Sequence, residues 1–475
     1  MKRILLFIIS VLILIQLKAE LTMPAIFSDN MVLQRETDVA IWGKASPNEK
    51  ISVTGSWSKE NVRTVTDSIG NWRIKIKTPH AGGPYKLIIS EKNKIIFNNV
   101  LIGEVWLCSG QSNMEFRIKG SMSQPNLGST ETILKANNSN IRFFTVKRAA
   151  SAQPQSDCKG SWMESNPSTV SEFSAIAYYF GSLINESLHI PVGLISSSYG
   201  GSIAECWMSR DILQMYPNVK LPALGEQINN PSGTASVLYN SMLHPVIGYG
   251  IRGVIWYQGE SNRNRPDEYA KLFPAMVEEW RKEWEIGEFP FYYAQIAPNG
   301  YLFKGQKGVT SARMREIQLD CMKTIPNCGK AVLMDVGERD CIHPANKKVV
   351  GERLAYWALA NQYGFNTIEF RSPEFKKMDV KDNIINISFS YAPNGLTSFG
   401  KEITGFELAG NDGVFYPAIA KLNLPNAQIA CSSLSVLNPV YVRYAFQDWI
   451  IGSLFSTSGL PLSSFRTDNL PVYEE

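Results

Sequence analysis

Residues 103–114 read GEVWLCSGQSNM, and this stretch shows how the central part of the chain is built. Its first half is an apolar, β-rich run, and its second half is a polar turn that contains glycine. The same change recurs where VGLISSS at 192–198 runs into YGGS, GVIWYQ at 253–258 into GESN, and AVLMDV at 331–336 into GERDCIHP. Runs without strict alternation of apolar and polar residues are typical of parallel strands that are buried on both faces.

Helix-like segments separate these runs, and a further strand, FYYAQI, is expected at 291–296. The expected helices lie around residues 172–187, 267–284, 312–324 and 346–362. This alternation predicts an α/β domain with a five-stranded parallel sheet over residues 100–364. Ligands of such open sheets bind beyond the carboxyl ends of the strands, so the polar turns mark the expected site.

The flanking regions have a different texture. Residues 20–99 hold short alternating runs, such as VAIWG and WRIKIK, between Gly, Pro, Asn and Asp turns, which predicts a small antiparallel β domain. Residues 365–475 return to strands and turns. We interpret them as a C-terminal β-rich region, or as strands that complete the first β domain.

Residues 1–19 are typical of a secretory signal peptide. Lys2 and Arg3 are followed by an apolar run over residues 4–17 and by the small residue Ala19. The run is shorter than the ~20 apolar residues that a membrane-spanning helix needs. We therefore expect cleavage after Ala19, export to the periplasm or the cell exterior, and no membrane span once the leader is removed.

Composition excludes several classes of protein. With 475 residues, 44% of them hydrophobic and 19% charged, the chain is globular and long enough for more than one core. Its formal net charge of +4 includes three basic residues of the leader, so the mature chain shows no electrostatic footprint for nucleic acid. The seven cysteines and four histidines lack the spacing of a zinc site, and no metal or other cofactor is expected.

Ser112 is a candidate nucleophile in the turn after the first strand, although a serine there more often serves a turn or caps a helix. A serine hydroxyl attacks a carbonyl only when a base removes its proton. Of the histidines at positions 80, 189, 244 and 343, only His343 follows a predicted core strand. The alternative interpretation of His343 is a loop residue beside Pro344.

Asp340 precedes His343 by three residues and is predicted to orient it. A carboxylate at the imidazole Nδ1 would leave Nε2 facing the serine. Asp335 and Glu338 are rivals for this role. Asp335 ends a predicted buried strand, and Glu338 is expected to be solvated.

Acyl transfer also needs N–H donors that stabilise the developing oxyanion. Gly200 and Gly201 lack a Cβ, so a backbone N–H there can come close to a ligand. The same two glycines could simply form a tight turn. We predict an oxyanion hole made by the N–H groups of Ser112 and Gly201 and the side chain of Gln258, with Asn262 as the alternative side-chain donor.

Glu260 in QGESN would repel an oxyanion unless its charge is neutralised, so it is predicted to be a buried scaffold residue paired with Arg313 or Arg315. The aromatic residues that crowd the strand ends are predicted to be mostly core, with one or two forming a wall on which a sugar stacks. The residues assigned to substrate contacts are Asn113, Tyr199, Trp256, Glu260 and Asn262.

Four stretches, GEVWLCSGQSNM, SYGGSIAECWMS, GVIWYQGESN and DCIHPANKKVVGERLA, together resemble the sialate O-acetylesterase family of SGNH-type hydrolases. The resemblance extends from PAIFSDNMVLQR near the start to GLPLSSFRTD near the end. It implies a flavodoxin-like catalytic domain joined to β-sandwich regions, and metal-free hydrolysis of acetyl esters through an acyl-serine intermediate. It places the nucleophile at Ser112, the histidine at His343 and the glycine of the second block at Gly201.

Two departures from the family pattern affect this transfer. The third block commonly reads Gly-x-Asn-Asp, whereas this chain has QGESN, so the role of Gln258 rests on its position alone. Family members also vary just before the histidine, and a backbone carbonyl is therefore an alternative to Asp340.

The expected function is that of a serine carboxylic-ester hydrolase acting on O-acetylated carbohydrate, with O-acetylated sialic acid as the first candidate substrate. An acetyl-xylan or other polysaccharide acetylesterase of the same mechanism is the nearest alternative. A non-catalytic carbohydrate-binding protein built on the β regions is an alternative of a different class. A phosphoester hydrolase is disfavoured because the sequence has neither a phosphate loop nor a metal-ligand cluster.

Overall fold

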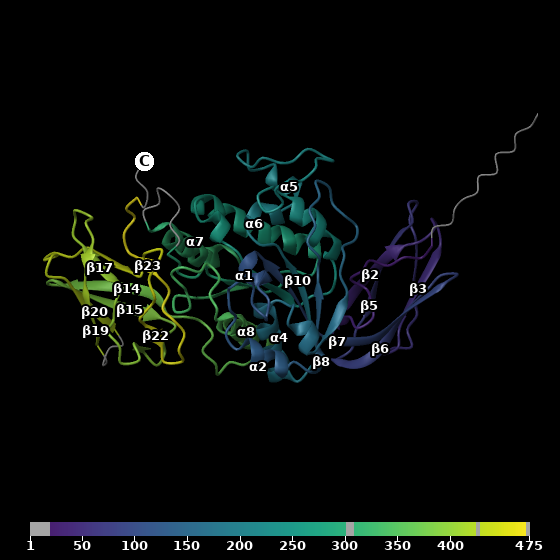
Figure 1. The fold of residues 1–475 in the computed structure, drawn as a ribbon, viewed down its shortest axis with the longest axis horizontal. Helices are drawn as coiled ribbons and strands as arrows, with labels where there is room; N and C mark the ends of the chain where they lie inside the picture. Colours follow the sequence, from purple (N-terminus) through teal and green to yellow (C-terminus); the bar gives the residue numbers. More distant parts are fainter. Residues whose placement is uncertain (1–19, 301–307, 424–427, 472–475) are drawn as a thin grey trace, which may run out of the picture.

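The computed structural model describes residues 20–300, 308–423 and 428–471, so the predicted signal peptide lies outside the described residues. An N-terminal β region, a central α/β region and a C-terminal β region follow one another along the molecule (Figure 1). The central sheet has the strand order β13-β12-β11-β7-β10-β8-β9. Its strands are β7 Lys94–Gly110, β8 Asn138–Thr145, β9 Trp162–Ser165, β10 Val192–Ser198, β11 Gly253–Tyr257, β12 Phe291–Ala294 and β13 Cys328–Ala331.

The prediction of five parallel strands is wrong by one strand. The first six strands of that order are parallel, and only β9 runs antiparallel to its neighbour. The missed strand is β8, whose apolar run is interrupted by Arg142. This arginine is nevertheless only 2% exposed, because it donates hydrogen bonds to the backbone carbonyls of Ser139 (3.0 Å) and Asn30 (3.1 Å).

The strand predicted at 331–336 is shifted toward the N-terminus of the chain and ends at Ala331. Beyond that point Val332 and Met334 pack into the core of the C-terminal region instead of continuing the sheet. The apolar pattern of AVLMDV is therefore that of a segment shared between two cores.

Helices cover both faces of the central sheet, as the sequence predicts. On one face α4 and α8 contribute to one hydrophobic cluster, and on the other α6 and α7 contribute to a second (Figure 1). The Ser174 hydroxyl caps α4 by accepting the N–H of Ala177 (3.2 Å), and Asn346 caps α8. The helices are α1 Ser112–Glu115, α2 Ser129–Leu134, α3 Pro167–Val170, α4 Ala175–Leu188, α5 Arg210–Leu213, α6 Pro266–Trp284, α7 Thr310–Thr324 and α8 Lys347–Tyr363.

The N-terminal β region is joined to the central sheet through β7, a strand of 17 residues. Its first part pairs with β6 and β1, and its later part pairs with β10 and β11. The predicted boundary at residues 99 and 100 thus falls inside one strand. The strands of this region are β1 Val32–Gln34, β2 Asp38–Lys44, β3 Lys50–Gly55, β4 Val62–Val65, β5 Asn71–Lys77 and β6 Gly82–Ser90.

The C-terminal region is rich in antiparallel strands. Two four-stranded sheets, ordered β14-β15-β20-β19 and β18-β17-β21-β23, contribute to one hydrophobic cluster, and β16 pairs with β22. The strands are β14 Glu374–Lys381, β15 Ile384–Ser390, β16 Leu396–Thr397, β17 Phe406–Ala409, β18 Tyr416–Pro417, β19 Ile419–Asn423, β20 Gln428–Ser432, β21 Tyr441–Tyr444, β22 Phe455–Ser456 and β23 Phe465–Arg466.

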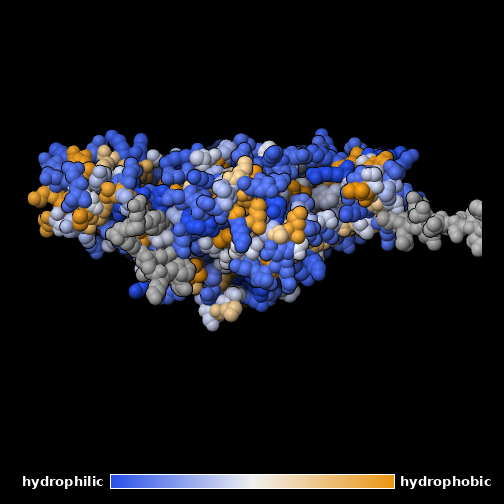
Figure 2. Space-filling view, turned by 90° about the horizontal axis from the view of Figure 1, so that it is seen from above, coloured by the Kyte–Doolittle hydropathy of each residue, from blue (hydrophilic) through white to orange (hydrophobic). Residues whose placement is uncertain are grey.

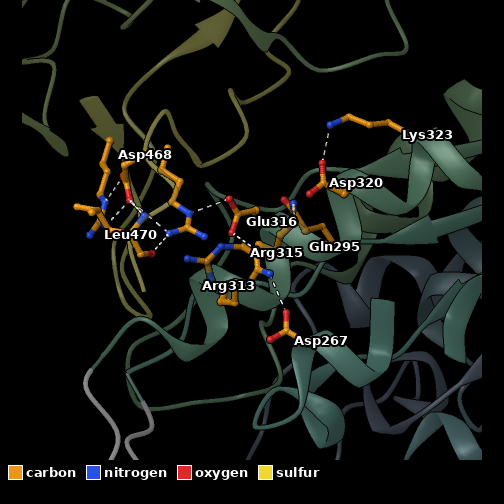
Figure 3. A network of polar contacts seen from close by, with 11 residues as sticks. Asp267, Gln295, Arg313, Arg315, Glu316, Asp320, Lys323, Asp468 and Leu470 are labelled. Atoms are coloured by element: carbon orange, nitrogen blue, oxygen red, sulfur yellow. Dashed lines mark hydrogen bonds and ion pairs between the residues drawn. The ribbon is translucent and has the colours of Figure 1, made fainter. Parts of the chain in front are cut away.

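A network of charges ties the C-terminal region to α7 (Figure 3). Arg466 pairs with Glu316 of α7 (2.9 Å) and also with Asp468 (3.3 Å), which Arg443 binds through both carboxylate oxygens (2.8 Å each). The Asp468 side chain is fully buried. Although burial raises the pKa of this carboxyl, the two arginines hold it below its ordinary value.

We expect Asp468→Asn to lower the free energy of unfolding by about 3 kcal/mol, because the change leaves the largely buried Arg443 without this carboxylate and Arg466 with Glu316 alone. Thermal unfolding followed by circular dichroism measures the effect. Asp379→Asn is the matched control, since Asp379 is 62% exposed and pairs with an equally exposed Lys377. Equal midpoints for the two variants would contradict a stabilising role for the network.

Seen from above, the molecule shows mostly hydrophilic residues on this face, with hydrophobic residues in scattered groups (Figure 2). This mixture is ordinary for a protein surface that faces water. Among the described residues, every helix is too short or too polar to cross a membrane.

Candidate active site

Ser112 lies at the carboxyl edge of the central sheet, at the start of α1 and directly after β7. The turn between them depends on Gly110, which has a φ of 140°. A Cβ at this position would lie 2.2 Å from the carbonyl oxygen of Tyr257, so a larger residue cannot adopt this turn. The turn leaves Ser112 half-buried and open to one side.

His343 is the hydrogen-bond partner of Ser112. Its Nε2 lies 2.8 Å from Ser112 Oγ, and its Nδ1 lies 2.7 Å from Gln124 Oε1. An amide oxygen can only accept, so Nδ1 carries the proton and Nε2 presents a lone pair to the serine. Burial, and then the charge of Lys347, lower the pKa of His343 to about 4, so at neutral pH the imidazole is ready to accept a proton.

The residue that orients His343 is therefore Gln124 and not Asp340. Asp340 is exposed, and the position at Nδ1 is filled by the amide. The two rivals are also engaged elsewhere. Asp335 pairs with Arg353 (2.6 Å), and Glu338 Oε1 accepts the N–H of Ala345 (2.6 Å), which shapes the loop that carries His343.

Of the three predicted oxyanion-hole donors, Gln258 is not available in the structure. Gln258 is fully buried, and its Nε2 donates to the carbonyl of Ser202 (3.1 Å) and to Asn262 Oδ1 (2.6 Å), which uses both of its N–H bonds. It cannot also serve an oxyanion. Gly201 has a φ of 76°, and its N–H and that of Ser112 have no acceptor within the described residues.

Glycine 200, the neighbour of Gly201, has a different task. Its N–H donates to Glu115 Oε2 (2.9 Å), which fixes the loop after β10 against α1. Of the two glycines singled out by the sequence, Gly201 is therefore the one whose N–H is available.

Three residues assigned to substrate contacts belong to the interior. Trp256 is 0% exposed because β11 is buried on both faces, and its ring packs edge-on against Trp207 and Trp280. Asn262 is also 0% exposed and accepts the N–H of Ala204 (2.9 Å), and Asn113 is 1% exposed. These three predictions are wrong in the structure, since none of these side chains reaches the surface.

Glu260 is also buried, as predicted, but its partner is not an arginine of α7. Asn113 Nδ2 donates to Glu260 Oε1 (2.7 Å), and burial raises the pKa of the carboxyl. Arg313 instead pairs with Asp267 (2.7 Å; Figure 3). Arg315 donates to Ser464 Oγ (3.3 Å). The contacts of Arg315 lie in the C-terminal region, which the pattern of α7 alone does not reveal.

Around Gly200, next to Ser112, lie two residues that the sequence did not single out, Glu115 and Arg148, together with Tyr199. Arg148 Nε donates to Glu115 Oε1 (2.6 Å), and its guanidinium lies 4.6 Å above the ring of Tyr199. A Cβ at Gly200 would come within 3.5 Å of Ser112 Cβ and 3.3 Å of Arg148 Nη2. The Arg148 side chain is 55% exposed.

We expect Gln124→Ala to lower kcat/KM for an acetyl ester by about 10- to 100-fold, because the imidazole loses the acceptor that fixes its tautomer. The matched control is Asp340→Ala, which should stay within about twofold of the parent because Asp340 is exposed and does not occupy Nδ1. Steady-state kinetics on one substrate compares them. The reverse order of effects would restore Asp340 as the orienting residue.

Comparison with known proteins places these features in context. The family model for carbohydrate esterases described as sialic acid-specific acetylesterases matches residues 102–359. The sialate O-acetylesterase of Mus musculus is 29% identical over 429 residues, covering 77% of this chain and 78% of the relative. That of Homo sapiens is 29% identical over 398 residues, covering 76% and 75%. A solved carbohydrate acetylesterase from Xanthomonas citri is 32% identical with a TM-score of 0.86, covering 95% of this chain and 100% of that structure.

Proposed function

The chain belongs to the sialic acid-specific acetylesterase family of carbohydrate esterases, and from this membership we propose that it hydrolyses O-acetyl esters of sialic acid through an acyl-serine intermediate. The observation that carries the proposal is the 2.8 Å contact between Ser112 Oγ and His343 Nε2, with Nδ1 held by Gln124. A serine, a base and a group that orients the base are the parts that acyl transfer requires.

The reaction proceeds in two halves. His343 Nε2 takes the proton of Ser112 Oγ as the oxygen attacks the acetyl carbonyl carbon, and the N–H groups of Ser112 and Gly201 donate to the oxyanion. Collapse of this intermediate breaks the bond to the sugar oxygen, which takes the proton from His343. Water then gives a proton to His343 and attacks the carbonyl carbon of the acetyl-serine. When the bond to Ser112 Oγ breaks, acetate leaves and His343 returns the proton to Oγ, which restores the serine and the neutral imidazole.

Sialic acid is favoured over neutral sugars by Arg148. A sialic acid carries a carboxylate, whereas xylan lacks one, and a guanidinium is suited to binding carboxylates. Arg148 lies near Ser112 across Gly200 and its side chain is 55% exposed, and Glu115 already binds both its Nε and its Nη2. The substrate carboxylate would thus join an existing ion pair at the edge of the site.

The three parts of the chain take defined roles in this proposal. Residues 100–364 form the SGNH-type catalytic domain, and residues 20–99 and 365–475 form β-sandwich regions that flank it, with β7 running from the N-terminal region into the catalytic domain. Residues 1–19 act as a signal peptide that directs export to the periplasm or the cell exterior. Support for the central assignment is the parallel sheet with Ser112 and His343 at its carboxyl edge.

A substrate panel tests the proposal. Acetate release is measured from O-acetylated sialic acid, from acetylated xylo-oligosaccharides and from 4-nitrophenyl acetate, with the parent and Arg148→Ala. We expect the parent to prefer sialic acid, and Arg148→Ala to raise KM for that substrate while changing the neutral ones little. Preference for the xylo-oligosaccharides in the parent would favour a polysaccharide acetylesterase, and failure to cleave any of the three would overturn the esterase mechanism.

A further inference from the structure

Lys347 is a buried cation directly beneath the nucleophile turn. It begins α8 and is 0% exposed, and its Nζ donates to Asn113 Oδ1 (2.5 Å) and lies 4.7 Å from the centre of the Phe116 ring. Burying an ammonium group is costly unless it has partners. The reaction described above assigns no task to this group.

Asn113, the residue next to Ser112, links Lys347 to the rest of the site. Its Nδ2 donates to Glu260 Oε1 (2.7 Å) and to the carbonyl of Ile342 (3.2 Å), while its Oδ1 accepts from Lys347. One amide therefore joins the nucleophile turn to α8, to the end of β11 and to the residue before His343. All three hydrogen bonds of this amide matter here, because each fixes a different segment.

We propose that Lys347 is a positioning residue of the esterase reaction, which fixes the turn of Ser112 through Asn113 and keeps the His343 imidazole neutral through its charge. The proposal rests on the proposed catalytic roles of Ser112 and His343. Lys347 does not touch the reacting atoms. It acts on Ser112 through the hydrogen bond to the Asn113 amide, and on His343 through the electrostatic effect of its charge.

The arrangement of charged groups supports the effect of Lys347 on the protonation of His343. The Phe116 ring contacts both groups, since its centre lies 4.7 Å from Lys347 Nζ and 5.9 Å from the centre of the His343 ring. An ammonium this close opposes a second positive charge on the imidazole. The groups that face Lys347 from other segments are Glu260 after β11 and, on the histidine loop, Glu338 and Cys341.

Lys347 carries its charge in the pH range in which His343 would otherwise be protonated. Burial lowers the pKa of Lys347 to about 7, against the opposing influence of Glu260, Cys341 and Glu338. Below that pH the ammonium is charged, and this is the range in which an ordinary imidazole would take up a proton. The cation thus protects the base form of His343 on the acid side of neutrality.

The test replaces Lys347 with methionine, which keeps an unbranched side chain only one atom shorter and removes the charge. We expect the acid limb of the kcat/KM profile on 4-nitrophenyl acetate to move up by about one pH unit or more, and kcat at pH 8 to fall about tenfold or more while KM changes little. The control is Lys348→Met, the next residue on α8, whose side chain is 61% exposed. It should leave both quantities unchanged.

A second measurement does not depend on turnover. The imidazole of His343 is titrated by NMR in Ser112→Ala and in Ser112→Ala with Lys347→Met, and His343→Gln assigns the signal. If Lys347→Met does not fold, Lys347→Met with Glu260→Gln removes both buried charges and is used instead. An unchanged titration of His343 together with kcat/KM within twofold of the parent overturns the proposal. A parent that cleaves no acetyl ester would refute the proposed function, and the titration would still decide the effect of Lys347 on His343.

Discussion

Ser112→Ala is expected to lower kcat/KM for acetyl-ester hydrolysis by about 10⁴- to 10⁶-fold. The change removes Oγ, the atom that lies 2.8 Å from His343 Nε2 and that forms the bond to the acetyl group. Acetate release from O-acetylated sialic acid measures the loss. Because Ser112 is half-buried and its hydroxyl bonds only within the site, the unfolding midpoint should stay close to that of the parent.

Ser121→Ala is the matched control for this result. Ser121 lies in the same segment of the chain, and its side chain is exposed. The control should keep its activity and should still react with a serine-directed organophosphate, with one adduct by mass spectrometry, whereas Ser112→Ala should not react. Undiminished acetate release by Ser112→Ala would remove the nucleophile from the mechanism. Glycan binding by the parent without any organophosphate adduct would favour a non-catalytic carbohydrate-binding protein.

His343→Ala is the second change with a large expected effect, a loss of about 10⁴- to 10⁵-fold in kcat/KM. Without the imidazole no group takes the proton of Ser112 during attack, and none returns it to the sugar oxygen. The effect should be in kcat, because the imidazole acts on the reacting proton and not on the bound sugar. Added free imidazole should restore part of the activity.

His244→Ala is the control for the histidine. His244 is exposed, and its Nδ1 bonds the carbonyl of Gln155 (2.8 Å), far along the chain from Ser112. His80 pairs with Glu36 on the surface, and His189 ends α4, so both have local roles. Loss of activity in His244→Ala equal to that in His343→Ala would mean that the effect is one of folding.

The pairing of Ser112 with His343 could be predicted because each follows a strand of the same parallel sheet, and such strand ends meet at one edge. Gln124 could not be found in this way. It lies 219 residues from His343 in a loop, and an amide there matches no spacing rule. Asp340 was favoured because it is close in sequence, but the loop turns its side chain outward into solvent.

The burial of Gln258 and Asn262 in QGESN at 258–262 could not be predicted from the sequence either. Gln258 and Asn262 were expected to face the substrate because they follow a core strand. Both are 0% exposed, and they bond one another (2.6 Å) together with the loop after β10. A polar residue at a strand end satisfies buried backbone as readily as it binds a ligand, and sequence alone does not separate these tasks.

The 17-residue span of β7 has a consequence for how the chain can be divided. The strand that ends in the nucleophile turn is also a strand of the N-terminal sheet, so the two regions are not interchangeable modules on a linker. Cutting the chain before residue 100 would strip β7 of its first part and expose apolar surface of a cluster that both regions share. Evolution could therefore exchange the N-terminal region only by preserving the register of this strand, and with it the position of the reactive serine.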